Sequence, residues 1–278
     1  MHKLKRLSIL QSNPSFIFVK TDISNKKVLE DVFKKHKPQK VVNLAAQAGV
    51  RYSLVNPHAY MESNILGFMN ILECCRHNNV EGLIYASSSS VYGSNKKIPF
   101  SESDNVDSPI SIYAASKKSN ELMASSYNHL FGIRSTGLRF FTVYGPWGRP
   151  DMAMYIFASK ILNNEPIQVF NHGNMKRDFT YIDDIINGIL SSIENNHNCE
   201  IFNLGNNKYE NLMDVVSLIE SKIGKKAIIK FEVMQDGDVE KTHADIDKAK
   251  RKLGFKPITN VKDGIGHFID WYLEYLKI

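Results

Sequence analysis

Residues 108–122 read SPISIYAASKKSNEL, a stretch in which a proline-containing loop passes into a predicted helix. Tyr113 and Lys117 are four residues apart, so on a helix they lie one above the other on the same face. The same spacing recurs at Tyr92 and Lys96, but the Gly-Ser-Asn between them favours a turn. The spacing alone is therefore weakly specific, and the surrounding sequence must decide what the pair does.

Short apolar segments lie on both sides of this helix and alternate with helical patterns. The predicted strands are FIFVKTD (16–22), KVVNLAA (40–46), GLIYASS (82–88) and STGLRFF (135–141). A long helix is expected over 56–78, because Asn56 can cap it and Pro57 suits its first position. Strands that alternate with helices predict an α/β fold with a parallel sheet covered on both faces.

The pattern changes after residue 145. Short predicted strands (167–170 and 201–205) are mixed with predicted helices (180–193, 211–224 and 261–278). Phe268, Trp271, Tyr272 and Tyr275 recur at helical spacing in the last helix, which indicates a core-facing stripe. We therefore expect one domain over 1–145 and a smaller α/β unit over 146–278, with some segments of the second returning to the first.

The composition is that of an ordinary globular protein, with 43% hydrophobic and 23% charged residues among 278. The net charge of +6 comes without a nucleic-acid motif, so we expect no nucleic-acid partner, and an anionic small substrate suits such a surface. Cys74, Cys75 and Cys199 form no Cys-x-x-Cys pair, which predicts neither a metal site nor a disulfide framework. No apolar run predicts a signal peptide or a membrane span, so a cytoplasmic location is expected.

Small and polar residues follow two predicted strands, at the end where open parallel sheets bind ligands. ASSSSVYG (86–93) places four serines there, and NLAAQAG (43–49) places small residues where backbone can approach a flat cofactor. The plainer interpretations are that the serines cap the next segment and that the small residues allow a helix to pack tightly on the sheet. The phenol of a free tyrosine has a pKa of about 10. We expect the Lys117 ammonium to lower the pKa of Tyr113 toward the range in which it can act as a base.

Seven stretches spread along the chain resemble one family. They are AAQAGVRYS, NPHAY, SNILGF, YASSSSVYG, YAASKKSNELMA, TGLRFFTVYGPWGRPDMA and KRDFTYIDDI. With them the chain resembles the extended short-chain dehydrogenases/reductases of the NAD-dependent epimerase/dehydratase family, and most closely its UDP-glucuronate 4-epimerases. The resemblance implies a Rossmann-like NAD-binding domain over 1–145 and a nucleotide-sugar domain over 146–278.

The resemblance also implies roles for individual residues. The catalytic residues would be Ser88, Tyr113 and Lys117. NAD would contact Asp22, Ile23, Leu44, Ala45, Ala46, Gln47, Asn64, Tyr113, Lys117, Phe140 and Val143. The UDP-sugar substrate would contact Ser89, Ser90, Thr142, Arg149 and Arg177.

The implied reaction is interconversion of UDP-glucuronate and UDP-galacturonate through a 4-keto intermediate, serving polysaccharide synthesis. Related 4,6-dehydratases carry Asp-Glu where this chain has Ser89-Ser90, and hydroxyls replace a shifted carboxylate poorly, which favours epimerisation. Arg51 and Arg149 could meet a sugar carboxylate or could be structural, so a neutral UDP-hexose stays open as the substrate. A homodimer through helices 56–78 and 111–130 is expected.

The sequence departs from the family's pattern in two places. No Gly-x-x-Gly-x-x-Gly run is present, and the first glycine is Gly49. We therefore expect an N-terminally truncated sheet without its opening strand–helix–strand unit, and weak NAD binding; the alternative function is a non-catalytic remnant of such an epimerase. Asp236 stands where the family carries proline before Gly237, which puts the shape of that loop in question.

Overall fold

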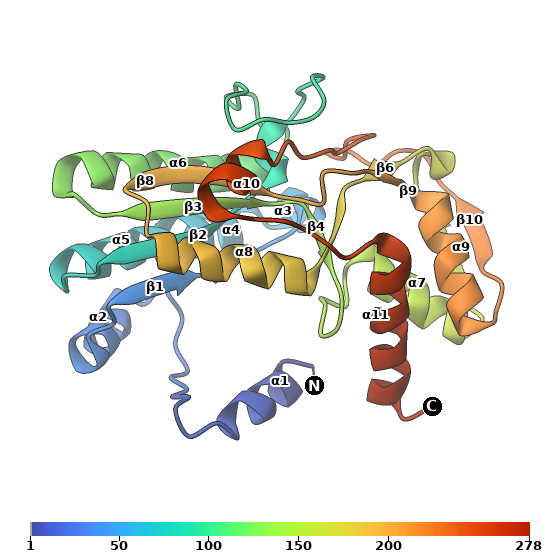
Figure 1. Ribbon diagram of the computed structural model, residues 1–278, viewed down its shortest axis with the longest axis horizontal. Coiled ribbons are helices and arrows are strands. Elements are labelled where there is room, and N and C mark those ends of the chain that lie inside the picture. The colour runs from blue at the N-terminus through green and yellow to red at the C-terminus, as the bar shows by residue number, and fades with distance from the viewer. Residues whose placement is uncertain (1) are drawn as a thin grey trace.

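The computed structural model describes residues 2–278 and is built around a four-stranded parallel sheet (Figure 1). The strand order is β1 (Lys40–Asn43), β2 (Gly82–Ser88), β3 (Ser135–Phe140) and β8 (Cys199–Leu204). All four of these strands overlap strands that the sequence predicted. β8 comes from the second half of the chain and pairs with β3 in this sheet.

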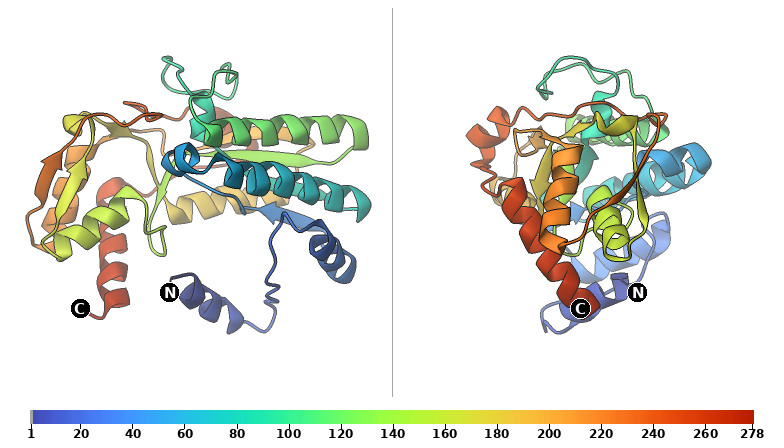
Figure 2. Two further views of the ribbon diagram at one scale, coloured as in Figure 1. Left: turned by 180° about the vertical axis from the view of Figure 1, so that it is seen from behind. Right: turned by 90° about the vertical axis from the view of Figure 1, so that its right-hand side faces the viewer.

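Helices cover both faces of this sheet, as Figures 1 and 2 show from opposite sides. The helices α5 (Gly67–His77) and α6 (Ile112–Phe131) lie on one face, with Phe68, Leu72 and Ala124 in the core there. The helices α8 (Ile182–Asn195) and α10 (Asp247–Leu253) lie on the other. Both faces of β2 are therefore buried, which is why its sequence is a continuous apolar run rather than an alternating one.

The second half of the chain forms its own core. Three two-stranded ladders surround it: β4 (Thr142–Tyr144) with β7 (Phe179–Tyr181), β5 (Pro166–Val169) with β10 (Ile228–Phe231), and β6 (Lys176–Arg177) with β9 (Glu210–Asn211). The helices α7 (Ala153–Leu162), α9 (Leu212–Ile223) and α11 (Val261–Leu276) pack together in the same core. Phe268 and Tyr272 of α11 are buried and Trp271 and Tyr275 pack against that core, which confirms the predicted aromatic stripe.

The remaining elements connect these layers. They are α1 (His2–Gln11), α2 (Lys26–His36), α3 (Val50–Val55), α4 (Pro57–Tyr60), a π-helical segment (Met61–Leu66) and two short 3₁₀ turns (Ser89–Tyr92 and Asn171–Gly173). The expected single helix over 56–78 is thus an α–π–α succession. No helix among residues 2–278 is both long and apolar enough to cross a bilayer.

The predicted strand over 16–22 is wrong. These residues run as an irregular segment between α1 and α2 (Figure 1), and Ile17, Phe18 and Val19 are exposed. A strand forms only where a neighbour supplies hydrogen-bond partners, and no strand of residues 2–278 lies beside this segment.

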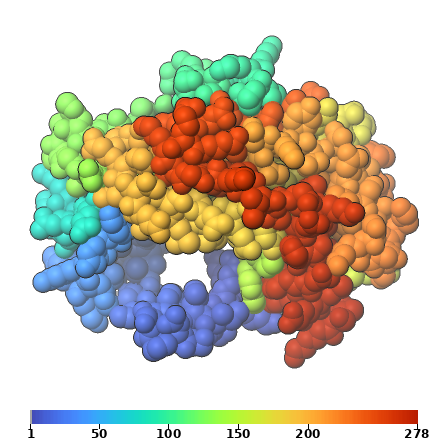
Figure 3. All heavy atoms as spheres, in the orientation of Figure 1, coloured from blue at the N-terminus to red at the C-terminus, as the bar shows by residue number. Residues whose placement is uncertain are grey.

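β1 forms one edge of the sheet. Within the described residues it pairs with β2 alone, and Val42 and Leu44 are exposed. The helix α1 buries none of its residues, and His2 and Arg6 attach it to Gly148 and Trp147 instead. The space-filling view shows an opening between this N-terminal segment, in dark blue, and the yellow helix α8 above it (Figure 3).

Candidate active site

Three groups of predicted site residues meet at the carboxyl edge of the sheet. The pairing of β1 with β2 and of β2 with β3 brings 44–47, 88–90 and 140–143 to the same edge, because Asn43 stands opposite Tyr85 and Ser88 opposite Phe140. Parallel strands place their carboxyl ends together, and ligands of open α/β sheets bind there. The structure thus juxtaposes the residues that the sequence assigned to cofactor and substrate.

Tyr113 and Lys117 lie on the first turns of α6, which packs against β2. The helix begins where Ser111 accepts a hydrogen bond from the backbone N–H of Ala114 at 3.1 Å, an N-cap that fixes its first turn. Tyr113 is partly buried, its ring lies edge-on to that of Tyr60 with centroids 6.0 Å apart, and the Ser88 side chain lies near enough to lower the pKa of its phenol. Phenol and serine are therefore neighbours, and Lys117 follows Tyr113 one helical turn along α6.

The expected lowering of the Tyr113 pKa is wrong for this structure. Burial raises the pKa of Tyr113 above its usual value of 10.0, and the Ser88 side chain and the charge of Arg149 oppose this only in part. The sequence places an ammonium one helical turn away but cannot weigh its effect against the loss of water around the phenol.

Lys117 is 3% exposed, and burial lowers its pKa to about 8. The carboxylate of Glu121, one further turn along α6, acts in the opposite direction and favours the ammonium. Lys117 is therefore a buried amine near its midpoint of titration at neutral to mildly alkaline pH, a state that functional sites use more often than structural ones.

Replacing Lys117 with methionine is expected to stabilise the fold at pH 7 while impairing the site. The native pKa lies below that of the unfolded chain, so the ammonium destabilises the native state below about pH 8, and this penalty disappears as pH rises toward 10.5. The gain at pH 7 should be on the order of 1–3 kcal/mol. Urea unfolding of both proteins at pH 7 and pH 9.5 measures it; a difference that does not shrink at pH 9.5 would contradict the assignment.

The side chain of Asn64 anchors the loop after β1 by hydrogen bonds. Its side-chain amide donates to the carbonyl of Gln47 at 3.0 Å and to Ser116 Oγ at 2.9 Å, and its Oδ1 accepts from the N–H of Gln47 at 2.8 Å. Asn64 lies in the π-helical segment, where its own carbonyl accepts from Asn120 at 2.6 Å. Single π turns are frequent at functional sites, and this one fixes the loop 44–47 while leaving Leu44 and Ala45 exposed.

Asp22 and Ile23 lie at the start of α2, beside α5. Asp22 is exposed, and its hydrogen bonds from the Ser24 N–H and hydroxyl lower the pKa of its carboxyl. Asn70 of α5 donates to the Ile23 carbonyl at 2.9 Å, and the Ile23 side chain packs so closely on Gly67 that a Cβ there would lie 2.7 Å from it. The segment is thus anchored to the same run of helix that carries Asn64.

Four of the five predicted substrate residues line one cavity. Ser89, Ser90, Thr142 and Arg177 face it together with Ser111 and the loop 237–239. Arg177 donates to Asp238 Oδ1 at 2.7 Å and to the Glu240 carbonyl at 2.9 Å, which ties the loop to β6. The loop therefore lines the cavity, although Asp236 stands where the family carries proline.

Arg149 lies in an adjoining hollow that shares Thr142 with this cavity. Its guanidinium forms an ion pair with Asp151, and its Nε lies 3.0 Å from Oδ1. Arg51, the other cation considered for a sugar carboxylate, stacks over the ring of Phe170 with 4.9 Å between its Cζ and the ring centroid. Both arginines thus have protein partners.

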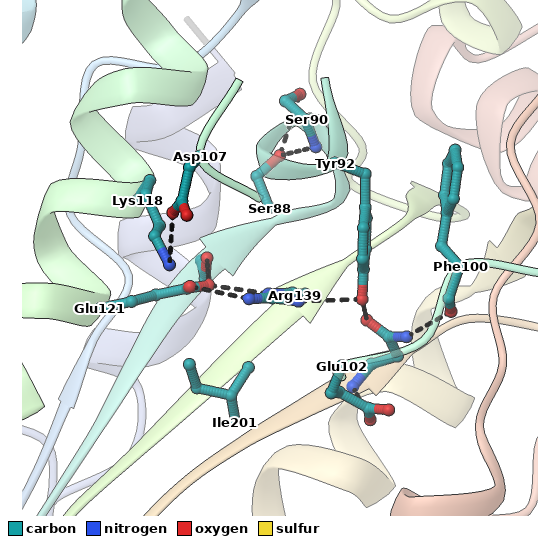
Figure 4. A network of polar contacts seen from close by, with 12 residues as sticks. Ser88, Ser90, Tyr92, Phe100, Glu102, Asp107, Lys118, Glu121, Arg139 and Ile201 are labelled. Carbon is teal, nitrogen blue, oxygen red and sulfur yellow. Dashed lines mark hydrogen bonds and ion pairs between the residues drawn. The ribbon is translucent and has the colours of Figure 1, made fainter. Parts of the chain in front are cut away.

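A buried polar network behind the site escaped the sequence analysis (Figure 4). Arg139 of β3 donates from Nε and Nη2 to the two carboxylate oxygens of Glu121, each at 2.8 Å, and from Nη1 to the Tyr92 hydroxyl at 3.0 Å. Tyr92 in turn donates to Asn203 Oδ1 at 2.6 Å, and Ser87 Oγ donates to Glu121 at 2.6 Å. The available signal was Glu121, which continues the spacing of Tyr113 and Lys117 by one more turn.

The residues that follow β1 and β2 suit the binding of the nicotinamide half of a dinucleotide. Ala45 and Ala46 are small, the loop is anchored by Asn64, and Lys117 supplies a buried amine on helix α6. Among residues 2–278, no group of three or more His, Cys, Asp or Glu side chains is arranged to hold a metal ion.

Known proteins share this sequence and this arrangement. Protein CapI of Staphylococcus aureus is 52% identical over 281 residues, covering 95% of this chain and 84% of that protein. UDP-glucuronate 4-epimerase 4 of Arabidopsis thaliana is 45% identical, covering 98% of this chain and 66% of that protein. The crystal structure of a Bacillus cereus UDP-glucuronic acid 4-epimerase with UDP-glucuronic acid and NAD matches with a TM-score of 0.93 at 34% identity, covering 99% of this chain and 87% of that one.

The family comparison agrees with these relatives. Residues 2–205 match the model of the NAD dependent epimerase/dehydratase family, and this match spans well over half of the chain. Together with the parallel sheet and the residues gathered at its carboxyl edge, the match assigns the fold as Rossmann-like and the cofactor of the family as NAD. The chain belongs to the NAD-dependent epimerase/dehydratase family.

Proposed function

We propose that this protein is a nucleotide-sugar 4-epimerase that interconverts UDP-glucuronate and UDP-galacturonate. The observation that carries the proposal is that Tyr113 lies near Ser88 at the end of β2, with Lys117 buried one turn further along α6 and with the cavity that Arg177 lines beside Ser89 and Ser90. The similarity to UDP-glucuronate 4-epimerases of Arabidopsis thaliana and Bacillus cereus supports the choice of sugar.

In this proposal the hydride chemistry at carbon 4 of the sugar would be supplied by NAD when it is bound. Leu44, Ala45, Ala46 and Gln47 would hold it, with Asp22, Ile23, Asn64, Phe140 and Val143 around them. Lys117 would hold its ribose. Residues 1–145 would thus carry the cofactor, and residues 146–278 mainly the substrate.

Tyr113 would move the proton. As phenolate it accepts the proton of the sugar 4-hydroxyl, directly or through Ser88, and gives it back when the carbonyl at carbon 4 is reduced again. The positive charge of Arg149 favours the phenolate against the effect of burial. Each cycle leaves the protein and the sugar with the same number of protons and electrons, so no external oxidant or reductant is consumed.

The cavity residues would hold the nucleotide sugar. Arg177 presents a guanidinium, whose planar fork suits a diphosphate, and Ser89, Ser90 and Thr142 offer hydroxyls to the sugar. Elimination of water from carbons 5 and 6 needs an acid and a base, and Ser89 and Ser90 supply neither at neutral pH. The site therefore favours epimerisation over dehydration.

A neutral UDP-hexose is the second candidate substrate. Arg149 is paired with Asp151, and Arg51 is stacked on Phe170, so a sugar carboxylate would have to compete for either cation. A neutral sugar has no carboxylate and would leave the contacts of both arginines intact.

We also propose a homodimer through helices 56–78 and 111–130. Met61 and Leu66 on the first, and Leu122 and Leu130 on the second, are large apolar side chains exposed to solvent. Burying such side chains against a second copy would supply the apolar core of an interface.

Incubation of the purified protein with NAD and each UDP-sugar tests the function. We expect UDP-galacturonate to appear from UDP-glucuronate, resolved by anion-exchange chromatography, faster than UDP-galactose appears from UDP-glucose. The reverse order would assign the neutral hexose. Failure of both conversions at millimolar NAD would support a non-catalytic remnant and contradict the proposal.

A further inference from the structure

We propose that Glu121 is a positioning residue for the proton-transfer pair: with Arg139 it fixes helix α6 on the sheet and so places Tyr113 and Lys117 opposite Ser88. This inference rests on the proposed function. Glu121 and Arg139 are 4% and 2% exposed, and their two parallel 2.8 Å contacts form a bidentate ion pair between α6 and β3. Such a pair fixes orientation as well as distance.

Glu121 lies on the same face of α6 as the pair it would position. Tyr113, Lys117 and Glu121 follow one another at four-residue spacing, so they form one row along the helix, about 12 Å from first to last at ~1.5 Å per residue. Any sliding or rotation of α6 relative to β3 would break the two contacts of Glu121 and would move Tyr113 by the same amount. The ion pair therefore sets the register of the whole row.

Arg139 fixes the serine side of the site as well. Its third contact goes to the hydroxyl of Tyr92, the last residue of the 3₁₀ turn Ser89–Tyr92 that follows Ser88. In Figure 4 the guanidinium lies between Glu121 and Tyr92, joining α6 to this turn. One side chain thus holds both partners of the proposed proton transfer, the phenol through Glu121 and the serine turn through Tyr92.

Glu121 also acts on the charge of Lys117. The charged group that acts on the ammonium is Glu121, from the same helix, and Glu121 itself faces Arg139 and Tyr85 from the sheet. Glu121 is the one that raises the pKa of Lys117 against burial. Without this carboxylate, Lys117 would lose its proton at lower pH.

Two variants test the inference. Glu121→Gln removes the charge but keeps the shape, and Glu121→Met with Arg139→Met replaces the whole ion pair by apolar side chains of similar volume, an exchange that folds commonly tolerate. Glu73→Gln is the matched control, since it removes a partly buried carboxylate on α5 that binds Arg76 and Tyr127.

We expect both Glu121 variants to fold, to keep the KM for the UDP-sugar within about twofold, and to lose at least about tenfold in kcat, because small displacements of reacting groups cost up to ~10²-fold. The alkaline limb of the kcat–pH profile should move to lower pH in Glu121→Gln. Glu73→Gln should leave kcat and its pH profile unchanged. A folded double variant with wild-type kcat would overturn the inference.

A second readout needs no turnover. Ionisation of Tyr113 is followed by absorbance at 295 nm, as the difference between each protein and its Tyr113→Phe counterpart. We expect the midpoint to fall toward the ordinary value of 10.0 in Glu121→Gln, because a loosened α6 returns water to the phenol, and to stay in place in Glu73→Gln. If the wild type converts no UDP-sugar, the proposed function fails, but this titration still tests the role of Glu121. If the enzyme is active and the midpoint of Tyr113 does not move in Glu121→Gln, the inference is wrong and the proposed function stands.

Discussion

Replacing Tyr113 with phenylalanine is expected to lower the rate of sugar epimerisation by about 10²–10⁴-fold, the usual contribution of a positioned acid–base group. The variant loses one hydroxyl, which is the atom that would take the proton of the sugar 4-hydroxyl beside Ser88. The ring and its edge-on contact with Tyr60 stay, so the fold should be preserved. The measurement is kcat with UDP-glucuronate, alongside the NAD released from the denatured protein, which should not change.

The control for this variant lies on the same helix. Tyr127 donates its hydroxyl to Glu73 at 2.8 Å, away from the serine turn, so Tyr127→Phe removes an equivalent group without touching the proposed proton transfer. Its kcat should stay within about threefold of the wild type, since the hydroxyl it loses lies outside the proton path. Substantial turnover by Tyr113→Phe would show that another group moves the proton.

Replacing Arg139 alone with methionine should destabilise the fold by about 3–5 kcal/mol, because it leaves the Glu121 carboxylate buried without its partner. Adding Glu121→Met should restore most of this loss, since no uncompensated charge then remains. Urea unfolding of the wild type, the single variant and the double variant at pH 7 gives the three free energies. A single variant that costs less than about 1 kcal/mol at pH 7 would show that the ion pair contributes little to holding α6 on the sheet.

Much of the sheet could be predicted from local sequence because buried parallel strands are continuous apolar runs. The segments at 82–88 and 135–141 became β2 and β3 almost residue for residue. The segment at 16–22 has the same composition but no neighbour within the described residues, and it stays irregular. Strand formation depends on long-range pairing, which no single stretch of sequence contains. The π turn at Asn64 was missed because its sequence continues an α-helical pattern.

The candidate site could be placed because strand ends in a parallel sheet must meet. This rule, together with the family resemblance, brought Ser88, Tyr113 and Arg177 to one edge. The charge state of Tyr113 could not be predicted, since it is a balance between burial and nearby charges that only the three-dimensional structure supplies. The ion pair of Glu121 and Arg139 was missed because the sequence around each residue does not show which charged residue lies opposite it in the fold.

The position of β1 at the rim of the sheet has a consequence for handling the protein. Within residues 2–278, one side of this strand offers its amide and carbonyl groups to no other strand, and the exposed Val42 and Leu44 make the rim apolar. Natural sheets usually shield such rims with charges, prolines or overlying segments. At high concentration this rim would template the addition of extended chains, so aggregation should begin there.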